Sequence, residues 1–401
     1  MSKSIGQRML ICQCLSQLPT EDLQCPLLDY GKKLTTEALL RIGVAAHLDQ
    51  MSSYSHIEEK IRAYTDLMKL LNVNGISGSQ ISRRINDLST EVVQSVFIKV
   101  MAKVRHYTRK QNGISNAIGR LDIVDSTEFR LPENMCDWAF ISKGHNAVKM
   151  HTRLVVTSKN TVFPDKIVPS TGNVTDFESS DVIIEEANAT YVMDRGYGSK
   201  KNLMDWLDKE IDFVARIGKN LVLYTLEERE PTHSSVLKDE TVNFGISNEP
   251  VRYIEFVDEK NQVYRILTTR FDLTDVEILE IYKNRWLIEL FFKWIKGHLK
   301  MRKIWSTKPQ GIWNHMFLAL IAYGLSLLIK LQLNSTKTAW NFFRVLQIYL
   351  FQPADRILNE LNRRKKPSKG RQKVQKPLGK KNLFFGDTGI VMVKEKKTKK
   401  K

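Results

Sequence analysis

YKNRWLIELFFKWIK, residues 282–296, is the stretch that decides how the rest of the chain is interpreted. Its polar residues recur at offsets of three, four, four and three positions, and this spacing predicts that they share one face of a helix. They are Tyr282, Arg285, Glu289, Lys293 and Lys296. The positions between them form a wide apolar stripe: Trp286, Leu287, Leu290, Phe291, Trp294 and Ile295. One carboxylate is therefore surrounded by cations and a phenol, which could hold a metal ion against a phosphodiester.

The same residues are also compatible with an ordinary surface helix. Glu289 stands four positions from both Arg285 and Lys293, and such pairs stabilise exposed helices without any further role. The choice between an active-site helix and a surface helix therefore depends on residues elsewhere in the chain.

Two aspartates upstream favour the active-site interpretation. Asp125 ends the strand-like segment LDIVD, and Asp194 ends YVMD before Arg195 and Gly196. An aspartate at the end of a strand projects into the crevice where ligands bind in α/β sheets, although each alone is more typical of a turn or helix cap. Together with Glu289 they form three widely separated carboxylates, which suit Mg²⁺ or Mn²⁺. Two such ions can support in-line displacement at phosphorus.

The composition indicates a polyanionic partner. The chain has 401 residues, 42% of them hydrophobic, and a formal net charge of +18. Nucleic acid and an anionic membrane surface are the two candidates. The longest apolar run, residues 316–329, is too short to span a bilayer and predicts a buried core helix. The N-terminus has no secretory signal, so we expect an intracellular protein. The four cysteines are sparse and lack a zinc spacing, which predicts thiols rather than a zinc site: Cys12, Cys14, Cys25 and Cys136.

The first part of the chain, residues 1–112, is predicted to be a helical DNA-binding domain. The segment NGISGSQISRRINDLS places a glycine-rich turn before a short helix that carries Arg83 and Arg84. A helix, a tight turn and a basic helix outline a helix-turn-helix, but an ordinary helical hairpin with a solvated basic face fits equally well. Arg83 and Arg84 are therefore candidate DNA contacts only.

The character of the sequence changes near residue 113. Short β-branched runs alternate with helical segments, and this predicts an α/β domain over residues 113–330. Residues 220–270 are strand-like and rich in loops. A C-terminal helical region is expected at 331–362, followed by a basic, disordered tail at 363–401, which attracts phosphate or is simply solvated. No Walker-type phosphate loop is present, so an ATP-driven helicase is excluded.

Three motifs, IVDST at Asp125, MDRGYGS at Asp194 and the Tyr-x2-Arg-x3-Glu-x6-Lys pattern of 282–296, resemble those of bacterial insertion-sequence transposases of the DDE type. Within that group the chain is similar to the IS-four family over roughly residues 30–350. The resemblance implies that residues 113–330 are a ribonuclease H-like catalytic domain, and that the strand-rich residues 220–270 are a β-rich insertion between the second aspartate and the glutamate. It implies a DNA transposase that binds terminal inverted repeats, cleaves the ends with Mg²⁺ (or Mn²⁺) and joins them to target DNA.

The resemblance also implies roles for individual residues. Asp125, Asp194 and Glu289 match the catalytic and metal-binding triad. The phosphate-binding positions are Tyr282, Arg285, Lys293, Lys296 and Arg216. Trp286 lies beside the site as a candidate DNA contact. The expected partners are double-stranded element ends and target DNA, with a homodimer in the synaptic complex, and the expected location is the bacterial cytoplasm at the nucleoid. A non-catalytic DNA-binding relative and a metal-dependent nuclease without strand transfer remain alternatives.

Overall fold

The computed structural model describes residues 9–20, 29–133, 135–158, 160–185, 187, 189–245, 249–299 and 304–363. The described residues up to Leu361 belong to one compact unit. The basic tail predicted at 363–401 and Cys25 lie outside the described residues, apart from Arg363. The domain boundaries expected near residues 112 and 330 stay predictions.

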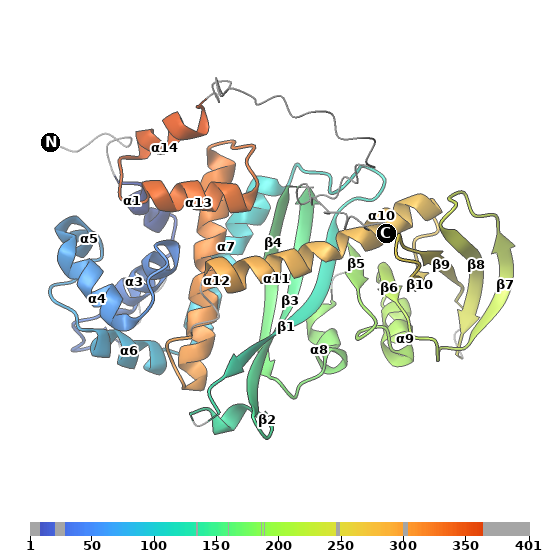
Figure 1. Cartoon of the computed structure of the whole chain (residues 1–401), viewed down its shortest axis with the longest axis horizontal. Coiled ribbons are helices and arrows are strands. Elements are labelled where there is room, and N and C mark those ends of the chain that lie inside the picture. Colours follow the sequence, from blue (N-terminus) through green and yellow to red (C-terminus); the bar gives the residue numbers. More distant parts are fainter. Residues whose placement is uncertain are drawn as a thin grey trace, which may run out of the picture. The chain divides into compact units, whose positions relative to one another are not determined.

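A single ten-stranded sheet organises the chain (Figure 1). The strands run in the order β2-β3-β1-β5-β6-β10-β9-β8-β7, and β4 pairs with β3. Their bounds are β1 (Leu121–Leu131), β2 (Phe140–Ser142), β3 (His145–Ser158), β4 (Thr161–Thr171), β5 (Thr190–Met193), β6 (Phe213–Arg216), β7 (Leu223–Arg229), β8 (Val236–Phe244), β9 (Val251–Val257) and β10 (Val263–Thr268). The fold is therefore mixed α/β with a large sheet.

Strand direction divides the sheet into three parts. Strands β1, β3 and β4 pair antiparallel, whereas β1, β5 and β6 pair parallel. The strand-rich stretch at 220–270 forms the antiparallel strands β7–β10, and β10 pairs with β6. This stretch therefore extends the central sheet and does not form a separate one.

The helices begin where the sequence offers capping residues. Capping boxes open α6, α8 and α10, at Ser77, Thr175 and Thr274, where the side chain of a Gln or Glu three residues later returns to the cap amide. The helix bounds are α1 (Leu10–Ser16), α3 (Thr36–Leu48), α4 (Tyr54–Ala63), α5 (Thr65–Leu70), α6 (Gly78–Asp87), α7 (Thr90–Thr108), α8 (Asp176–Ile183), α9 (Lys200–Asp208), α10 (Asp275–Asn284), α11 (Trp286–His298), α12 (Pro309–Gln332), α13 (Ala339–Tyr349) and α14 (Ala354–Leu361).

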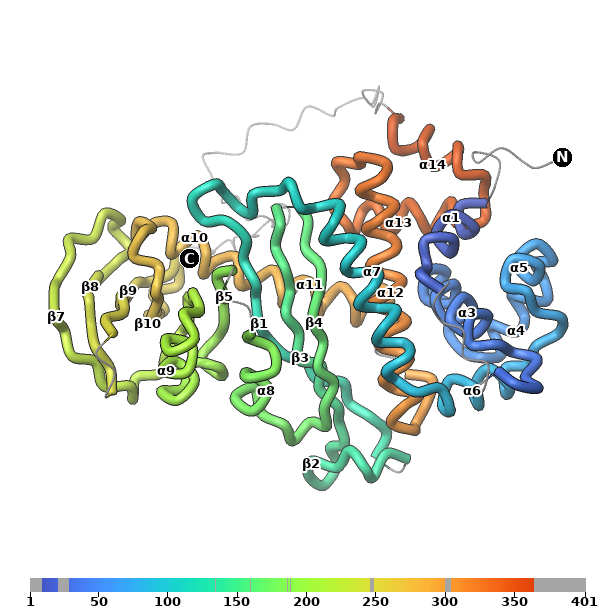
Figure 2. Tube along the Cα trace, turned by 180° about the vertical axis from the view of Figure 1, so that it is seen from behind, coloured from blue at the N-terminus to red at the C-terminus, as the bar shows by residue number. Residues whose placement is uncertain are grey.

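The central strands of the sheet are buried on both faces, because their alternate residues pack in two different hydrophobic clusters. Ile123, Val192 and Val214 pack in the cluster that includes α11 and α12. Their neighbours Val124 and Met193 pack in the cluster that includes α8 and α9. In Figure 1 α11 crosses in front of the strands, and in Figure 2, seen from behind, α8 lies in front of them. Period-two alternation thus places α11 and α8 on opposite faces.

Helix α12 is the central support of the helical part. It packs along α7 and against α3 and α6, as Figure 2 shows. Among the described residues it is the one helix long and apolar enough to cross a membrane by length and composition, but 94% of its most apolar window is buried inside the protein. The core helix predicted from residues 316–329 is therefore confirmed, within a helix of 24 residues that extends beyond that run at both ends.

Candidate active site

Asp125 and Asp194 lie next to each other, each directly after the last residue pair that joins the parallel strands β1 and β5. Val124 of β1 pairs with Met193 of β5, and the two aspartates are the residues that follow this pair. Asp125 does not end its strand as predicted, since β1 continues to Leu131 while paired with β3. What ends at Val124 is only the pairing with β5, so a crevice opens beside Asp125 inside a longer strand.

The two carboxylates interact electrostatically. Burial raises the pKa of Asp125 to about 7, and the negative charge of Asp194 contributes in the same direction. The backbone amide of Ser126 donates to Asp125 Oδ1 at 2.7 Å, and that of Gly196 donates to Asp194 Oδ1 at 2.8 Å. Each carboxylate is thus oriented by a nearby backbone amide, and the repulsion between them is of the kind that a bound cation relieves.

The helix predicted over residues 282–296 is present in outline, but it is interrupted at one residue. Residues 282–296 do not form a single helix: α10 ends at Asn284 and α11 begins at Trp286. Arg285 stands between them with helical dihedral angles (φ −52°, ψ −33°), and the two helices follow each other almost in line (Figure 1). Because the backbone stays close to helical, Arg285 and Glu289 still meet on one face, where the guanidinium donates to the Glu289 carboxylate.

Arg285 links the helix to the strands. Its guanidinium also lies 3.6 Å from Asp125 Oδ2, so one cation lies between two of the predicted metal ligands. Burial disfavours the charged form of Arg285, but Tyr282, Glu289 and Asp125 raise its pKa, and the group stays charged. The structure therefore brings Asp125, Asp194, Arg285 and Glu289 to one end of the sheet.

The apolar face of α11 differs from the predicted stripe. Its buried residues are Ile288, Phe291, Phe292 and Ile295. Trp286 is 57% exposed and Leu290 is 40% exposed. The predicted stripe left out the buried Ile288 and Phe292, because the core takes the positions that repeat every three or four residues from Ile288 onward. Trp286 consequently presents a large apolar ring to solvent near the aspartates.

The expected phosphate-binding residues occupy different environments. Tyr282 is buried, with its ring 5.9 Å from that of Tyr264. The guanidinium of Arg216, at the end of β6, lies 4.5 Å from the centre of the same Tyr264 ring. Lys296 donates to the Glu128 carbonyl at 2.8 Å. Lys293 is exposed on α11.

The two arginines of the predicted helix-turn-helix lie on α6. Arg83 is exposed. Arg84 is largely buried, pairs with Asp29 at 2.8 Å and donates to the Leu34 carbonyl. Arg84 thus connects α6 to the segment before α3, whereas Arg83 is available at the surface; their contact with DNA stays a prediction.

Sequence reasoning proposed neither Asp176, the first residue of α8, nor His151 of β3 as a site residue. The Asp176 carboxylate lies 3.4 Å from Nδ1 of the fully buried His151. Burial disfavours its charge, but His151 and the Ser126 hydroxyl lower the pKa of Asp176 below its usual value. The T-D-F-E pattern at 175–178 signals a helix start. Nothing in it indicates the proximity to Asp125, which only the tertiary fold creates.

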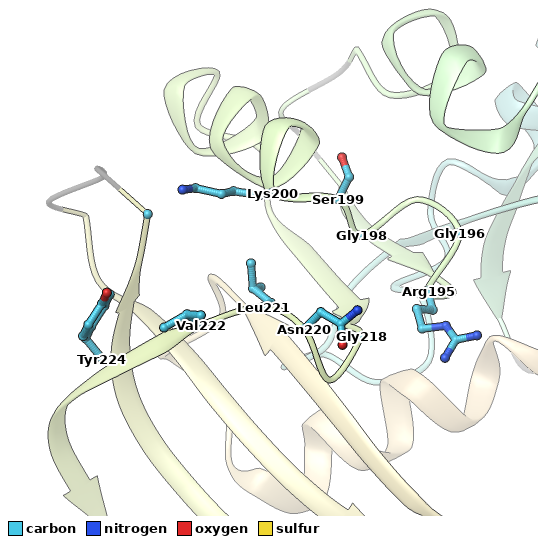
Figure 3. A pocket seen from close by; sticks show the side chains of 11 residues that line it. Arg195, Gly196, Gly198, Ser199, Lys200, Gly218, Asn220, Leu221, Val222 and Tyr224 are labelled. Carbon is cyan, nitrogen blue, oxygen red and sulfur yellow. The ribbon is translucent and has the colours of Figure 1, made fainter.

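An open hollow of about 670 Å³ lies on the other side of Asp194. Figure 3 shows Lys200, at the start of α9, and Arg195 extending away from each other on its rim. Exposed Val222 and Tyr224 form the far side. The hollow therefore combines cationic side chains, backbone amides at a helix start and an aromatic ring.

The donor set suits a divalent cation in part. Asp125 and Asp194 supply adjacent hard oxygen ligands, as Mg²⁺ and Mn²⁺ prefer. Among the described residues, no three acidic, histidine or cysteine side chains converge closely enough to form a ready-made metal cluster. The reason is visible at Glu289, whose carboxylate is engaged by Arg285. The pair Asp125–Asp194 thus offers two neighbouring hard oxygen donors, while Glu289 is engaged by Arg285.

Comparisons with known proteins agree with this geometry. Residues 119–325 match the family described as Transposase DDE domain. The chain is 25% identical over 304 residues to the probable transposase for insertion sequence element IS5377 of Geobacillus stearothermophilus, which covers 74% of this chain and 77% of that protein. It is 30% identical over 215 residues to the putative transposase y4zB of Sinorhizobium fredii, covering 51% and 59%.

The solved piggyBac transposase synaptic complex with hairpin DNA aligns over 90% of this chain and 80% of the other, with a TM-score of 0.42 and 11% identity. A TM-score of 0.42 is too low to assign the fold from this similarity. The class of protein is given by the family match, which is that of an enzyme acting on DNA phosphodiesters. The family match covers just over half of the 401 residues and contains Asp125, Asp194 and Glu289, so the chain belongs to the DDE transposase family. It is a DNA transposase of the cut-and-paste type.

Proposed function

We propose that Asp125, Asp194 and Glu289 are the catalytic triad, and that the transposase cleaves terminal inverted repeats and joins them to target DNA with Mg²⁺. The observation that carries this assignment is the meeting of Asp125 and Asp194, each directly after the last residue pair that joins the parallel strands β1 and β5, opposite the Arg285–Glu289 pair of α11. The strand order β4-β3-β1-β5-β6, with three antiparallel strands followed by two parallel ones, supports a ribonuclease H-like catalytic domain.

The bound cation would be held by Asp125 and Asp194, and would supply Lewis-acid stabilisation of the attacking and leaving oxygens at the phosphodiester. The chain's own residues position the DNA. Arg285 has the planar fork that grips a phosphate bidentately, and Lys293 adds an exposed point charge. When a phosphate takes the guanidinium of Arg285, Glu289 loses its partner and becomes available as the third ligand. Substrate binding would thus complete the acidic set.

Tyr282, whose charged neighbours include Arg285 and Arg216, would bind phosphate together with them. Tyr282 and Arg216 both lie against the Tyr264 ring, which fixes their orientation before DNA arrives. Lys296 would contribute mainly by holding α11 to β1 through the Glu128 carbonyl. Trp286, exposed beside Arg285, is available to stack against DNA.

The helical region 1–112 is proposed to bind the element ends, with Arg83 as its exposed cation on α6. A homodimer is proposed because two ends must be held together during joining. Activity at the nucleoid, in the bacterial cytoplasm, follows from the same substrate.

Cleavage of a labelled candidate end in the presence of Mg²⁺ tests this function. Wild type, Asp194→Ala and the matched control Asp208→Ala, an exposed carboxylate at the end of α9, would be compared. We expect sequence-specific nicking and joining to a target plasmid for wild type and the control, and neither for Asp194→Ala. Specific binding without cleavage in wild type would support a non-catalytic DNA-binding protein. Cleavage without joining would support a nuclease.

A further inference from the structure

Asp176 enters the acidic site from the opposite layer of the fold. It is the first residue of α8, the helix that covers the face of the sheet away from α11 (Figure 2). A methyl group built on Gly196 would lie 3.1 Å from Asp194 Oδ1 and 3.4 Å from Asp176 Oδ2. The two carboxylates therefore converge on the same glycine of the turn after β5. A side chain at position 196 would meet both of them.

His151 holds Asp176 in this place. The imidazole is fully buried on β3, directly across from Ser126, the neighbour of Asp125. Its Nδ1 lies 3.4 Å from Asp176 Oδ1 and 3.0 Å from Ser179 Oγ, while Nε2 lies 3.0 Å from Ser170 Oγ. Partners on both ring nitrogens fix the ring, so its Nδ1 edge faces the Asp176 carboxylate at a fixed place in the fold.

We propose that Asp176 is a fourth carboxylate of the metal-binding centre, that it strengthens the hold of Asp125 and Asp194 on a hydrated divalent cation, and that His151 is its positioning residue. Divalent ions such as Mg²⁺ keep several waters, so a carboxylate beside the first ligands can stabilise the ion without replacing those waters. Partners outside the direct ligands commonly change metal affinity by roughly 10–100-fold. The proposal rests on the proposed metal-dependent function.

Mn²⁺ titration of the DNA-free full-length protein, followed by the electron paramagnetic resonance of unbound Mn²⁺, tests the proposal without any turnover. We expect Asp176→Asn to weaken Mn²⁺ binding by about tenfold. Asp181→Asn removes an exposed carboxylate from the same helix and is the matched control, with unchanged affinity. Asp176→Ser keeps a good residue at the helix start and replaces Asp176→Asn if that variant does not fold.

A double-mutant cycle tests the role of His151. Because His151 is inferred to act through Asp176, His151→Leu should weaken Mn²⁺ binding in the wild-type background and have no further effect in Asp176→Asn. His151→Gln, which retains an N–H donor, should recover part of the affinity. If His151→Leu weakened Mn²⁺ binding by the same factor in the wild-type and Asp176→Asn backgrounds, the positioning role of His151 would be overturned.

The Mn²⁺ titrations distinguish failure of the Asp176 proposal from failure of the metal centre itself. One outcome would overturn the fourth-carboxylate proposal and leave the proposed function intact. In that outcome Asp176→Asn and Asp176→Ser bind Mn²⁺ as tightly as wild type does, whereas Asp194→Ala loses Mn²⁺ binding. No Mn²⁺ binding by wild type would overturn the metal centre itself, and with it this inference.

Discussion

The guanidinium of Arg285 lies 3.6 Å from the carboxylate of Asp125, and the same guanidinium donates to Glu289. An arginine therefore occupies the position between two carboxylates that the proposed chemistry assigns to a cation. The guanidinium neutralises the two carboxylates in the absence of DNA, and its paired N–H donors are available to an incoming phosphate. This relationship connects the helix-borne glutamate to the strand-borne aspartates.

Replacing Arg285 should have opposite effects on metal binding and on catalysis. Arg285→Gln removes the competing cation, so we expect Mn²⁺ affinity of the DNA-free protein to rise several-fold. Cleavage of element ends should fall by roughly 100-fold, because a charged phosphate contact is lost. Calorimetric titration and single-turnover cleavage measure the two effects.

Arg285→Lys is the matched variant, since it keeps the charge but loses the bidentate fork. It should retain wild-type Mn²⁺ affinity and yet cleave slowly. A fall in Mn²⁺ affinity in Arg285→Gln would show that Arg285 supports the metal ligands and does not compete for them.

Removing the charge of Asp125 should stabilise the metal-free protein while abolishing cleavage. The pKa of Asp125 is raised to about 7, first by burial and then by Asp194. The folded state thus holds the proton more tightly than the unfolded state, so ionised Asp125 costs stability, and the full cost is reached above pH 7. Asp125→Asn should raise the free energy of unfolding at pH 8 by roughly 1–3 kcal/mol.

Urea unfolding in a chelator at pH 8 and pH 4 measures this effect, with the exposed Asp208→Asn as control. The gain should shrink at pH 4, where folded wild type already carries the proton on Asp125. Equal stability of wild type and Asp125→Asn at pH 8 would mean that the carboxylate is not strained by burial and repulsion.

Replacing each of the two lysines of α11 should have a different effect, on DNA binding for Lys293 and on the stability of the fold for Lys296. Lys293 is exposed, so Lys293→Ala should leave unfolding unchanged and reduce the slope of log affinity against log salt by about one. Lys296 donates to the Glu128 carbonyl and lies 4.9 Å from the Phe129 ring centre. Lys296→Ala should therefore destabilise the protein by about 1–2 kcal/mol.

Salt-dependent DNA binding and urea unfolding of both variants distinguish these roles, and Lys296→Met retains the alkyl stem as a control. If Lys296→Ala changed only the salt slope, the lysine would contact DNA and not anchor the helix.

Buried histidines should make folding sensitive to mild acid. Burial lowers the pKa of His47 to about 4, and the neighbouring His315 ring lies 4.6 Å away, centre to centre, with its own pKa lowered well below the usual value by burial and by His47. The unfolded state binds these protons first. Stability is complete above pH 6.5 and is lost as pH falls toward 4, by roughly 3 kcal/mol for His47.

Urea unfolding across this range should give a shallower pH dependence for His47→Gln than for wild type. His106→Gln, at an exposed position on α7, should follow wild type. Parallel curves for wild type and His47→Gln would contradict the assignment of this acid sensitivity to the buried pair.

Local pattern was sufficient for most of the secondary structure, but not for the break at Arg285 or for the continuation of β1 past Asp125. The capping signals at Ser77, Thr175 and Thr274, and the β-branched runs of the sheet, concern neighbours within four residues, where propensity and hydrogen bonding act directly. The spacing of Arg285 and Glu289 likewise follows from helix geometry. The family motifs around Asp125 and Asp194 could be recognised because they are contiguous in sequence.

Only the tertiary structure could show which residues actually meet. The sequence alone determined the helices, most of the strands, the candidate triad and the class of enzyme. Packing decided that β1 runs past Asp125, that Trp286 and Leu290 stay exposed, that Arg285 bridges two carboxylates, and that Asp176 and His151 reach the site from α8 and β3. The physical reason is that such contacts join segments far apart in the chain, and their energies depend on burial and charge at places that no local pattern specifies.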